Sequence, residues 1–110
     1  MNESLNYMYI KEKLFTIIKY LATANGSMKE RLKTMSCELA LLEENAFPED
    51  LKKQWKTIEN KLYKYPAIFN GDNTREEMSS IEHSLDRVQG KTACKIASDI
   101  FELWENIQYR

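Results

Sequence analysis

The sequence predicts an all-α fold: a single compact bundle of four to five helices that spans residues 1–110 as one domain. Three observations predict it. Apolar residues recur at spacings of three and four along five segments, as in helices that bury one face. The chain has only three glycines and two prolines in 110 residues, whereas all-β folds need many turn residues. All three glycines fall between the apolar segments, so the local signals agree with one another.

The first two helices are expected to meet at a short turn. The first ends at Asn25-Gly26, because glycine tolerates the left-handed conformation that closes many helices. The second begins at Ser27, which forms a capping box with Glu30: each side chain accepts a hydrogen bond from the backbone N–H of the other residue. The expected buried positions are Ile10, Leu14, Ile17, Leu21 and Ala24, then Leu32, Met35, Leu39 and Leu42.

The third helix is expected to open at Pro48, whose fixed φ suits the first helical position. Glu49 and Asp50 follow, and acids stabilise the positive end of a helix. The helix ends near Tyr65, because Pro66 disfavours helical geometry in the residue before it. Its expected buried positions are Leu51, Trp55, Ile58 and Leu62.

Residues 66–73 are expected to be the one true loop, because Asn-Gly at positions 70 and 71 is a turn signal. Ile68 and Phe69 are apolar, so we expect them to pin this loop to the core. The fourth helix has two candidate starts, since Thr74-x-x-Glu77 and Ser79-x-x-Glu82 are both capping-box patterns. Its expected buried positions are Met78, Ile81, Leu85 and Val88.

The fifth helix is expected from about Thr92, after a stop at Gly90. It carries Ile96, Ile100, Leu103 and Ile107 on its buried face, which Phe101 and Trp104 widen. Short connections make neighbouring helices antiparallel, so we expect one bundle without a separate linker.

Composition argues against several functional classes. The net charge of −1 gives no overall attraction to nucleic acid or to an acidic membrane. No apolar run approaches the ~20 residues of a membrane span. The first residues lack the basic and apolar regions of a signal peptide. We therefore expect a cytoplasmic protein that does not bind membranes and whose two cysteines are reduced.

The motifs that could carry chemistry are incomplete. Gly90-Lys91-Thr92 resembles the end of a phosphate-binding loop, but Leu85 stands where that loop needs its first glycine. His83, the only histidine, has Asp86 nearby for acid–base work, yet spacing ties no nucleophile to it. One His and two distant Cys do not make a zinc-site spacing. We therefore expect no enzymatic activity, no catalytic or metal-binding residue and no cofactor.

The two cysteines have alternative roles. Cys37 lies between Met35 and Leu39, which favours a small buried or half-buried side chain. Cys94 lies on the flank of the last helix. A disulfide between them would require their helices to pack side by side, with Cα atoms within about 7 Å.

A basic, aromatic segment in the third helix is the main argument for nucleic-acid binding. Lysines neutralise phosphates, and Tyr rings stack on bases. Against this, acids interleave with the lysines, and no helix is rich in Arg, Asn and Gln as a recognition helix would be. The residues that would contact nucleic acid are Lys52, Lys53, Lys56, Lys61 and Lys64.

Aromatic residues outside the buried positions favour protein binding instead, because Tyr, Trp and Met are enriched at protein interfaces. The alternative is that they cover the ends of the bundle with their hydroxyls in water. The broad apolar face of the last helix could also bury part of itself in a homodimer. The candidate interface residues are Tyr7, Tyr9, Phe101, Trp104 and Tyr109.

Two stretches carry a resemblance. One is residues 22–32, Ala-Thr-Ala-Asn-Gly-Ser-Met-Lys-Glu-Arg-Leu, with Phe-Pro-Glu-Asp-Leu at 47–51; the other is Ser-Ile-Glu-His-Ser-Leu at 80–85, continuing to residues 92–101. They resemble segments of a set of short uncharacterised bacterial and phage helical proteins. The resemblance implies a bacterial or phage source and a helical fold. It implies no activity and no functional residues.

These observations together favour a non-enzymatic helical protein that acts by binding another protein, as a regulator, an inhibitor or an immunity- or antitoxin-like partner. The step from size and fold class to such a role is an analogy. The alternative is a nucleic-acid-binding regulator that uses the lysines of the third helix.

Overall fold

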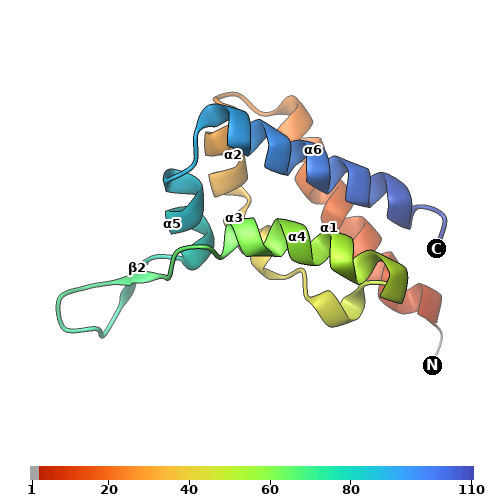
Figure 1. The fold of residues 1–110 in the computed structure, drawn as a ribbon, viewed down its shortest axis with the longest axis horizontal. Coiled ribbons are helices and arrows are strands. Elements are labelled where there is room, and N and C mark those ends of the chain that lie inside the picture. Colours follow the sequence, from red (N-terminus) through yellow and green to blue (C-terminus); the bar gives the residue numbers. More distant parts are fainter. Residues whose placement is uncertain (1–2) are drawn as a thin grey trace.

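The computed structural model describes the backbone of residues 3–110 and the side chains from residue 7 onward. Over that range the chain is mostly helical, with six α-helices, two short 3₁₀ helices and one two-stranded antiparallel sheet (Figure 1). The elements, in chain order, are α1 (Glu3–Thr23), α2 (Met28–Thr34), α3 (Ser36–Ala40), η1 (Glu44–Ala46), η2 (Glu49–Leu51), α4 (Lys52–Leu62), β1 (Ile68–Phe69), β2 (Glu76–Met78), α5 (Ser80–Asp86) and α6 (Gly90–Ile107).

The two longest helices, α1 and α6, run antiparallel, and the start of α1 and the end of α6 lie at the same end of the molecule (Figure 1). Lys11 Nζ donates a hydrogen bond to the carbonyl oxygen of Arg110 at 2.7 Å, which joins these ends. One continuous core lies between α1, α6 and the other helices. It includes nearly all the predicted buried positions, among them Ile10, Leu14, Ile17, Leu32, Leu39, Trp55, Ile58, Leu62, Leu85, Ile96, Ile100 and Leu103.

The second predicted helix is divided in two. The Met35 N–H bonds to the carbonyl of Leu32 as well as to that of Arg31, at 3.1 and 3.2 Å. This tight turn ends α2, and α3 begins at Ser36. Leu32 and Leu39 still reach the core on either side of the break, so the spacing of apolar residues was right although the helix is not continuous. The break raises the number of α-helices above the four to five expected.

Some helix ends follow their local sequence and others do not: the third predicted helix begins as the 3₁₀ turn η2, and its α-helical part, α4, starts at Lys52 and not at Pro48. Both Ser27 and Ser79 form full capping boxes, with Glu30 and Glu82, so the fourth predicted helix starts at Ser79 and not at Thr74. Gly90 is the first residue of α6 and not the stop of the preceding helix, which ends at Asp86. The α6 helix therefore starts two residues before the predicted position.

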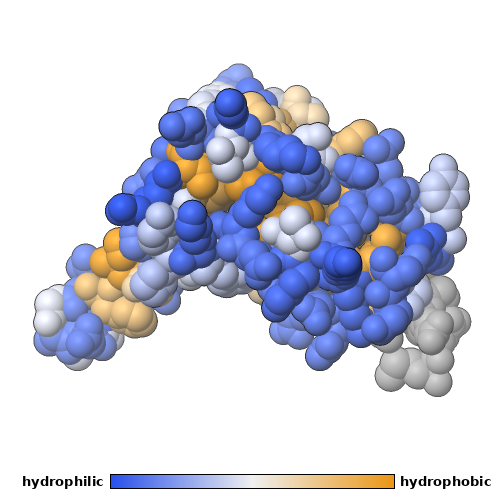
Figure 2. Space-filling view, in the orientation of Figure 1, coloured by the Kyte–Doolittle hydropathy of each residue, from blue (hydrophilic) through white to orange (hydrophobic). Residues whose placement is uncertain are grey.

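The expectation that Ile68 and Phe69 pin a loop to the core is wrong. Residues 66–79 form a β-hairpin, which we call the arm, that projects from the body (Figure 1). Ile68 and Phe69 are 38% and 48% exposed, and apolar surface is visible on the arm in Figure 2. The short strands pair with each other instead of with the body, with Ile68 opposite Met78. The side chains of Ile68 and Phe69 therefore do not contact the core.

The base of the arm is held firmly by α5. The Tyr65 N–H donates to Ser84 Oγ at 2.8 Å, and the Ser80 hydroxyl donates to the Tyr65 carbonyl. His83 Nδ1 lies 2.7 Å from the Pro66 carbonyl oxygen, and the His83 and Tyr65 rings are 5.4 Å apart. A carbonyl oxygen can only accept, so His83 Nδ1 carries the proton. These bonds fix the direction in which the arm leaves the body.

Candidate protein-binding surface

The antiparallel packing of α1 against α6 leaves an apolar groove on the surface between them. Side chains on α1 meet side chains of α6 in reverse order, so Phe15 lies beside Trp104 and Ile18 near Phe101. We call this surface the α1/α6 groove. Its lining includes polar and charged side chains as well as apolar ones: Lys11, Glu12, Phe15, Thr16, Ile18, Leu21 and Ala22 of α1, Met28 of α2, Cys94, Ala97, Ser98, Phe101 and Trp104 of α6, and Gln108 just after α6.

Three aromatic rings form the centre of the groove. The ring centroids of Phe15 and Trp104 are 6.3 Å apart, and those of Phe101 and Trp104 are 5.8 Å apart, both in tilted arrangements. Trp104 is half-buried and packs against the core, whereas Phe15 and Phe101 are 50% and 48% exposed. Trp104 therefore packs between the core and the surface, and the rings of Phe15 and Phe101 beside it are open to solvent.

Hollows lie on both sides of these rings. One, of about 270 Å³, is lined almost wholly by apolar groups from Ile18, Ala22, Met28, Ala97 and Phe101, together with Cys94 and Ser98. The other, of about 550 Å³, lies between Phe15, Trp104 and Gln108 and includes the charged Lys11 and Glu12. We call the first the apolar hollow. It has the size of a pocket for one or two large apolar side chains.

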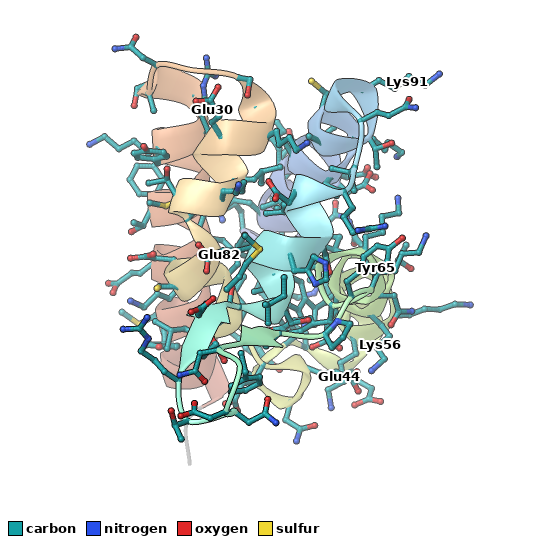
Figure 3. The ribbon with its side chains drawn as sticks, turned by 90° about the vertical axis from the view of Figure 1, so that its left-hand side faces the viewer. Glu30, Glu44, Lys56, Tyr65, Glu82 and Lys91 are labelled. Carbon is teal, nitrogen blue, oxygen red and sulfur yellow. The ribbon has the colours of Figure 1, made fainter. Side chains whose placement is uncertain are left out.

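No charged side chain lines the apolar hollow, and the acid Glu102 directly follows Phe101 on α6. Two lysines stand outside its lining: Lys91, one helical turn before Cys94, and Lys19, which lines a separate hollow with Tyr20 and Met35. Both are exposed, and neither takes part in the ion pairs found within the described part of the chain. Figure 3 shows the Lys91 side chain pointing into solvent at the start of α6.

The predicted interface residues are only partly brought together. Phe101 and Trp104 lie in the groove, and Tyr7 is half-buried one turn before Lys11 on α1. Tyr9 is on the other flank of α1: it is two residues from Lys11, which lines the groove, and so about 200° away around the helix. The Lys13 ammonium lies 5.7 Å from the centroid of the Tyr9 ring. Tyr109 lies beyond the end of α6 and is 87% exposed.

Sequence reasoning missed Phe15, Ile18 and Met28. Phe15 and Ile18 stand next to the buried Leu14 and Ile17, and an aromatic residue directly after a buried position lies about 100° off the core-facing row. The sequence therefore contained a signal that Phe15 and Ile18 lie beside the buried face of their helix and not on it. What the sequence did not show is that α6 contributes Phe101 at the same place.

The lysines predicted for nucleic acid are largely paired with acids. Lys52 Nζ is 2.9 Å from Glu49, and Lys61 Nζ is 3.8 Å from Asp99. Lys56 lies 3.2 Å from Glu59 and 3.6 Å from Glu44, as its position beside Glu44 in Figure 3 shows. The hydrogen bond from Lys56 to Glu59 raises the pKa of Lys56.

Only two lysines of this set are outside those pairs. Lys53 is exposed, and the Lys64 ammonium lies 5.8 Å from the centroid of the Tyr65 ring. Because most of the positive charge is already neutralised by neighbouring carboxylates, little of it is left to displace counterions from a phosphate backbone.

The histidine, the glycine-lysine-threonine motif and the two cysteines do not form a chemical site in the described residues. His83 holds the base of the arm. Gly90, Lys91 and Thr92 form the first turn of α6. Cys37 is exposed, which corrects the expectation of a buried or half-buried side chain: it points outward because Ser36 and Leu39 take the inward positions of α3. Cys94 is also exposed and free, so no disulfide joins the two.

The residues that the structure describes contain no group of three or more His, Cys, Asp or Glu side chains placed to hold a metal ion. None of their helices combines the length and the apolar character needed to cross a membrane. Comparison with protein-family models, with curated proteins and with solved structures finds no match to this chain. The chemistry of the surface is therefore what bears on function.

Proposed function

We propose that this chain is a non-enzymatic protein-binding module, and that its α1/α6 groove binds an apolar segment of a polypeptide. The observation that carries the proposal is the aromatic centre of the groove: Phe15 and Phe101, each about half exposed, supported by Trp104. Aromatic residues of this kind dominate the binding energy at protein interfaces. Holding them in place beforehand lowers the entropic cost of binding.

The character of the bound segment follows from the lining of the groove. The apolar hollow accepts large aliphatic or aromatic side chains. A small helical protein with such a surface would serve as a regulator, an inhibitor or an immunity- or antitoxin-like partner in a bacterium or phage.

Nucleic-acid binding through Lys52, Lys53, Lys56, Lys61 and Lys64 is the alternative. The ion pairs of three of these lysines speak against it. It predicts that any material bound by the protein is lost after nuclease treatment.

The experiment compares three tagged proteins as bait in a lysate of the native host, with and without nuclease. They are the wild type, Phe101→Glu in the groove, and Leu41→Glu as a matched control. Leu41 is as exposed as Phe101, at 48%, but lies at the end of α3, outside the groove. We expect a protein bound in fixed ratio by the wild type and the Leu41 variant, resistant to nuclease and lost in the Phe101 variant.

Cys94 provides a second measurement on the same samples, because it lines the apolar hollow whereas Cys37 does not. Occupation of the groove should slow alkylation of Cys94 by a maleimide and leave the rate at Cys37 unchanged. The groove is not the binding surface if all three baits retain the protein equally and its binding changes the alkylation rate of neither Cys94 nor Cys37.

A further inference from the structure

The tip of the arm, residues 70–75, begins with an asparagine whose side chain can react with the backbone that follows it. The backbone nitrogen of Gly71 can attack the amide carbon Cγ of Asn70, because the two atoms lie in adjacent residues and their bond closes a succinimide ring. Glycine has no Cβ to obstruct this approach. Gly71 is exposed, and no atom lies within 4 Å of the place where a Cβ would stand. The approach to Asn70 Cγ is therefore unobstructed.

The amide oxygen of Asn70 is held by donors at the place where it would gain negative charge. Oδ1 accepts hydrogen bonds from the N–H groups of Thr74 and Arg75 at 2.8 and 3.1 Å. When the ring closes, this oxygen becomes an oxyanion, and N–H donors already aimed at it stabilise that state. The same two bonds polarise the amide beforehand and make Cγ more electrophilic.

The amide nitrogen of Asn70, which is the leaving group, contacts a hydroxyl that is tied to a carboxylate. Asn70 Nδ2 donates to Thr74 Oγ1 at 3.0 Å, and the Thr74 hydroxyl donates to Asp72 Oδ1 at 2.7 Å. Hydrogen bonds from the Thr74 hydroxyl and N–H hold the pKa of Asp72 below its ordinary value, so Asp72 is a carboxylate at neutral pH. A hydroxyl placed in this way can pass protons to a reacting nitrogen.

The N–H of Gly71, which must lose its proton before the nitrogen attacks, is not engaged elsewhere. It has no acceptor within the described part of the chain, whereas the Asn70 carbonyl in the same peptide group accepts the Asn73 N–H at 3.0 Å. A hydrogen bond to that carbonyl withdraws electrons from the peptide group and makes the Gly71 N–H more acidic. The nucleophile, the oxyanion and the leaving group thus each have the contact that favours the reaction.

We propose that the tip of the arm promotes its own deamidation at Asn70. The Gly71 nitrogen loses its proton to water and forms a bond to Cγ; the bond from Cγ to Nδ2 breaks, and Nδ2 leaves as ammonia after taking a proton through Thr74 Oγ1. Water then opens the succinimide at either acyl C–N bond, which leaves aspartate or isoaspartate at position 70. The net change is the loss of ammonia and the gain of water, so neither an oxidant nor a cofactor takes part.

Either product changes the tip. Both place a carboxylate near Asp72, and neither keeps the Nδ2 donor to Thr74 Oγ1. Isoaspartate also inserts a methylene into the backbone, which disturbs the hydrogen bond of 2.9 Å from the Asn70 N–H to the Arg75 carbonyl. That bond closes the hairpin next to Phe69, so the shape of the arm would change with the age of the molecule.

The chain contains its own control for this reaction in a second Asn-Gly pair, Asn25-Gly26, at the end of α1. Asn25 is exposed, and its side chain takes part in none of the hydrogen bonds described around that turn. The test incubates the purified protein in native buffer and in urea, and follows deamidation and isoaspartate at both sites by mass spectrometry of peptides. In urea the two sites should react at similar rates. Folding should accelerate Asn70 about tenfold, which is less than a positioned acid–base group contributes in an enzyme, and should not accelerate Asn25.

Variants at Thr74 separate the proton route from the order of the tip. Thr74→Val removes the hydroxyl but keeps the backbone N–H that faces Oδ1, so Asn70 should react more slowly, toward its rate in urea. Thr74→Ser keeps the hydroxyl and should react like the wild type. Residue 74 is exposed, and circular dichroism checks that both variants are folded. The proposal is overturned if Asn70 reacts no faster in the native protein than in urea, or if Thr74→Val leaves its native rate unchanged.

Discussion

The backbone N–H of Tyr65 donates a hydrogen bond to Ser84 Oγ at 2.8 Å, across 19 residues of sequence. Ser84 is 1% exposed, so its hydroxyl serves this bond in the interior. The bond joins the end of the α4 segment to α5 and lies at the base of the arm. The buried hydroxyl of Ser84 is thus one of three α5 side chains, with Ser80 and His83, that hold the base of the arm.

Replacing Ser84 with alanine should therefore loosen the base of the arm. The Tyr65 N–H would lose its acceptor in a partly buried place, which costs about 1 to 2 kcal/mol of unfolding free energy. Urea denaturation should show this loss, and amide hydrogen exchange should accelerate in residues 66–79 more than in α1. Ser98→Ala, at an exposed position of α6, is the control and should change neither quantity. Equal acceleration throughout the chain would contradict a local role.

Two glycines should respond to alanine in opposite directions. Gly26 has a φ of +95°, a conformation that side chains rarely adopt, so Gly26→Ala should destabilise the protein by about 1 kcal/mol. Gly90 begins α6 without a positive φ, and no atom lies within 4 Å of an added Cβ. Gly90→Ala should stabilise the protein by roughly 0.5 kcal/mol, because the unfolded chain loses freedom. Midpoints of thermal unfolding of the two variants, measured side by side, check the signs.

Stability should fall in acid. Backbone and hydroxyl hydrogen bonds from Ser27 hold the pKa of Glu30 below its ordinary value, and Lys33, 2.7 Å away, lowers the pKa of Asp86. A carboxylate with a lowered folded-state pKa stabilises the fold above its unfolded pKa and loses that contribution as the pH falls through the folded value. The free energy of unfolding should therefore decline below about pH 5.

A variant identifies the source of this decline. Lys33→Met removes the partner of Asp86, so its decline in acid should be shallower than that of the wild type. Lys53→Met removes a lysine without an acidic partner in the described ion pairs and serves as the control. Parallel curves for wild type and Lys33→Met, measured by urea denaturation at several pH values, would exclude this ion pair as a contributor.

Trp55 should tolerate one substitution far better than another. It is fully buried and stacked on Phe47, with ring centroids 5.3 Å apart, and its Nε1–H has no hydrogen-bond acceptor among the described residues. Trp55→Ala leaves a large cavity and should cost about 3 to 5 kcal/mol. Trp55→Phe keeps an aromatic ring and removes the unpaired donor, so the cost should be under about 2 kcal/mol. Chemical denaturation of both variants checks the difference; equal costs would contradict it.

The sequence by itself determined the elements that depend on neighbours within one or two turns. Ser27 and Ser79 cap their helices because the partner glutamates stand three residues away. Leu14, Trp55 and Ile100 are buried because their neighbours at three and four residues make one apolar face. Such interactions are present in the local sequence, so the helical class and most of the core could be predicted from it.

The tertiary structure decided what lies on the surface. Phe101 looked like an extension of a buried face, and only the position of α1 leaves it half exposed beside Trp104 and near Ile18. Phe69 looked like an anchor for a loop, and only the pairing of β1 with β2 holds it away from the core. Burial of an apolar side chain is favourable whether it packs against the core or against a binding partner, because the hydrophobic effect is non-directional. The choice between them is made by which distant segments pack together, and that depends on contacts between residues far apart in the chain.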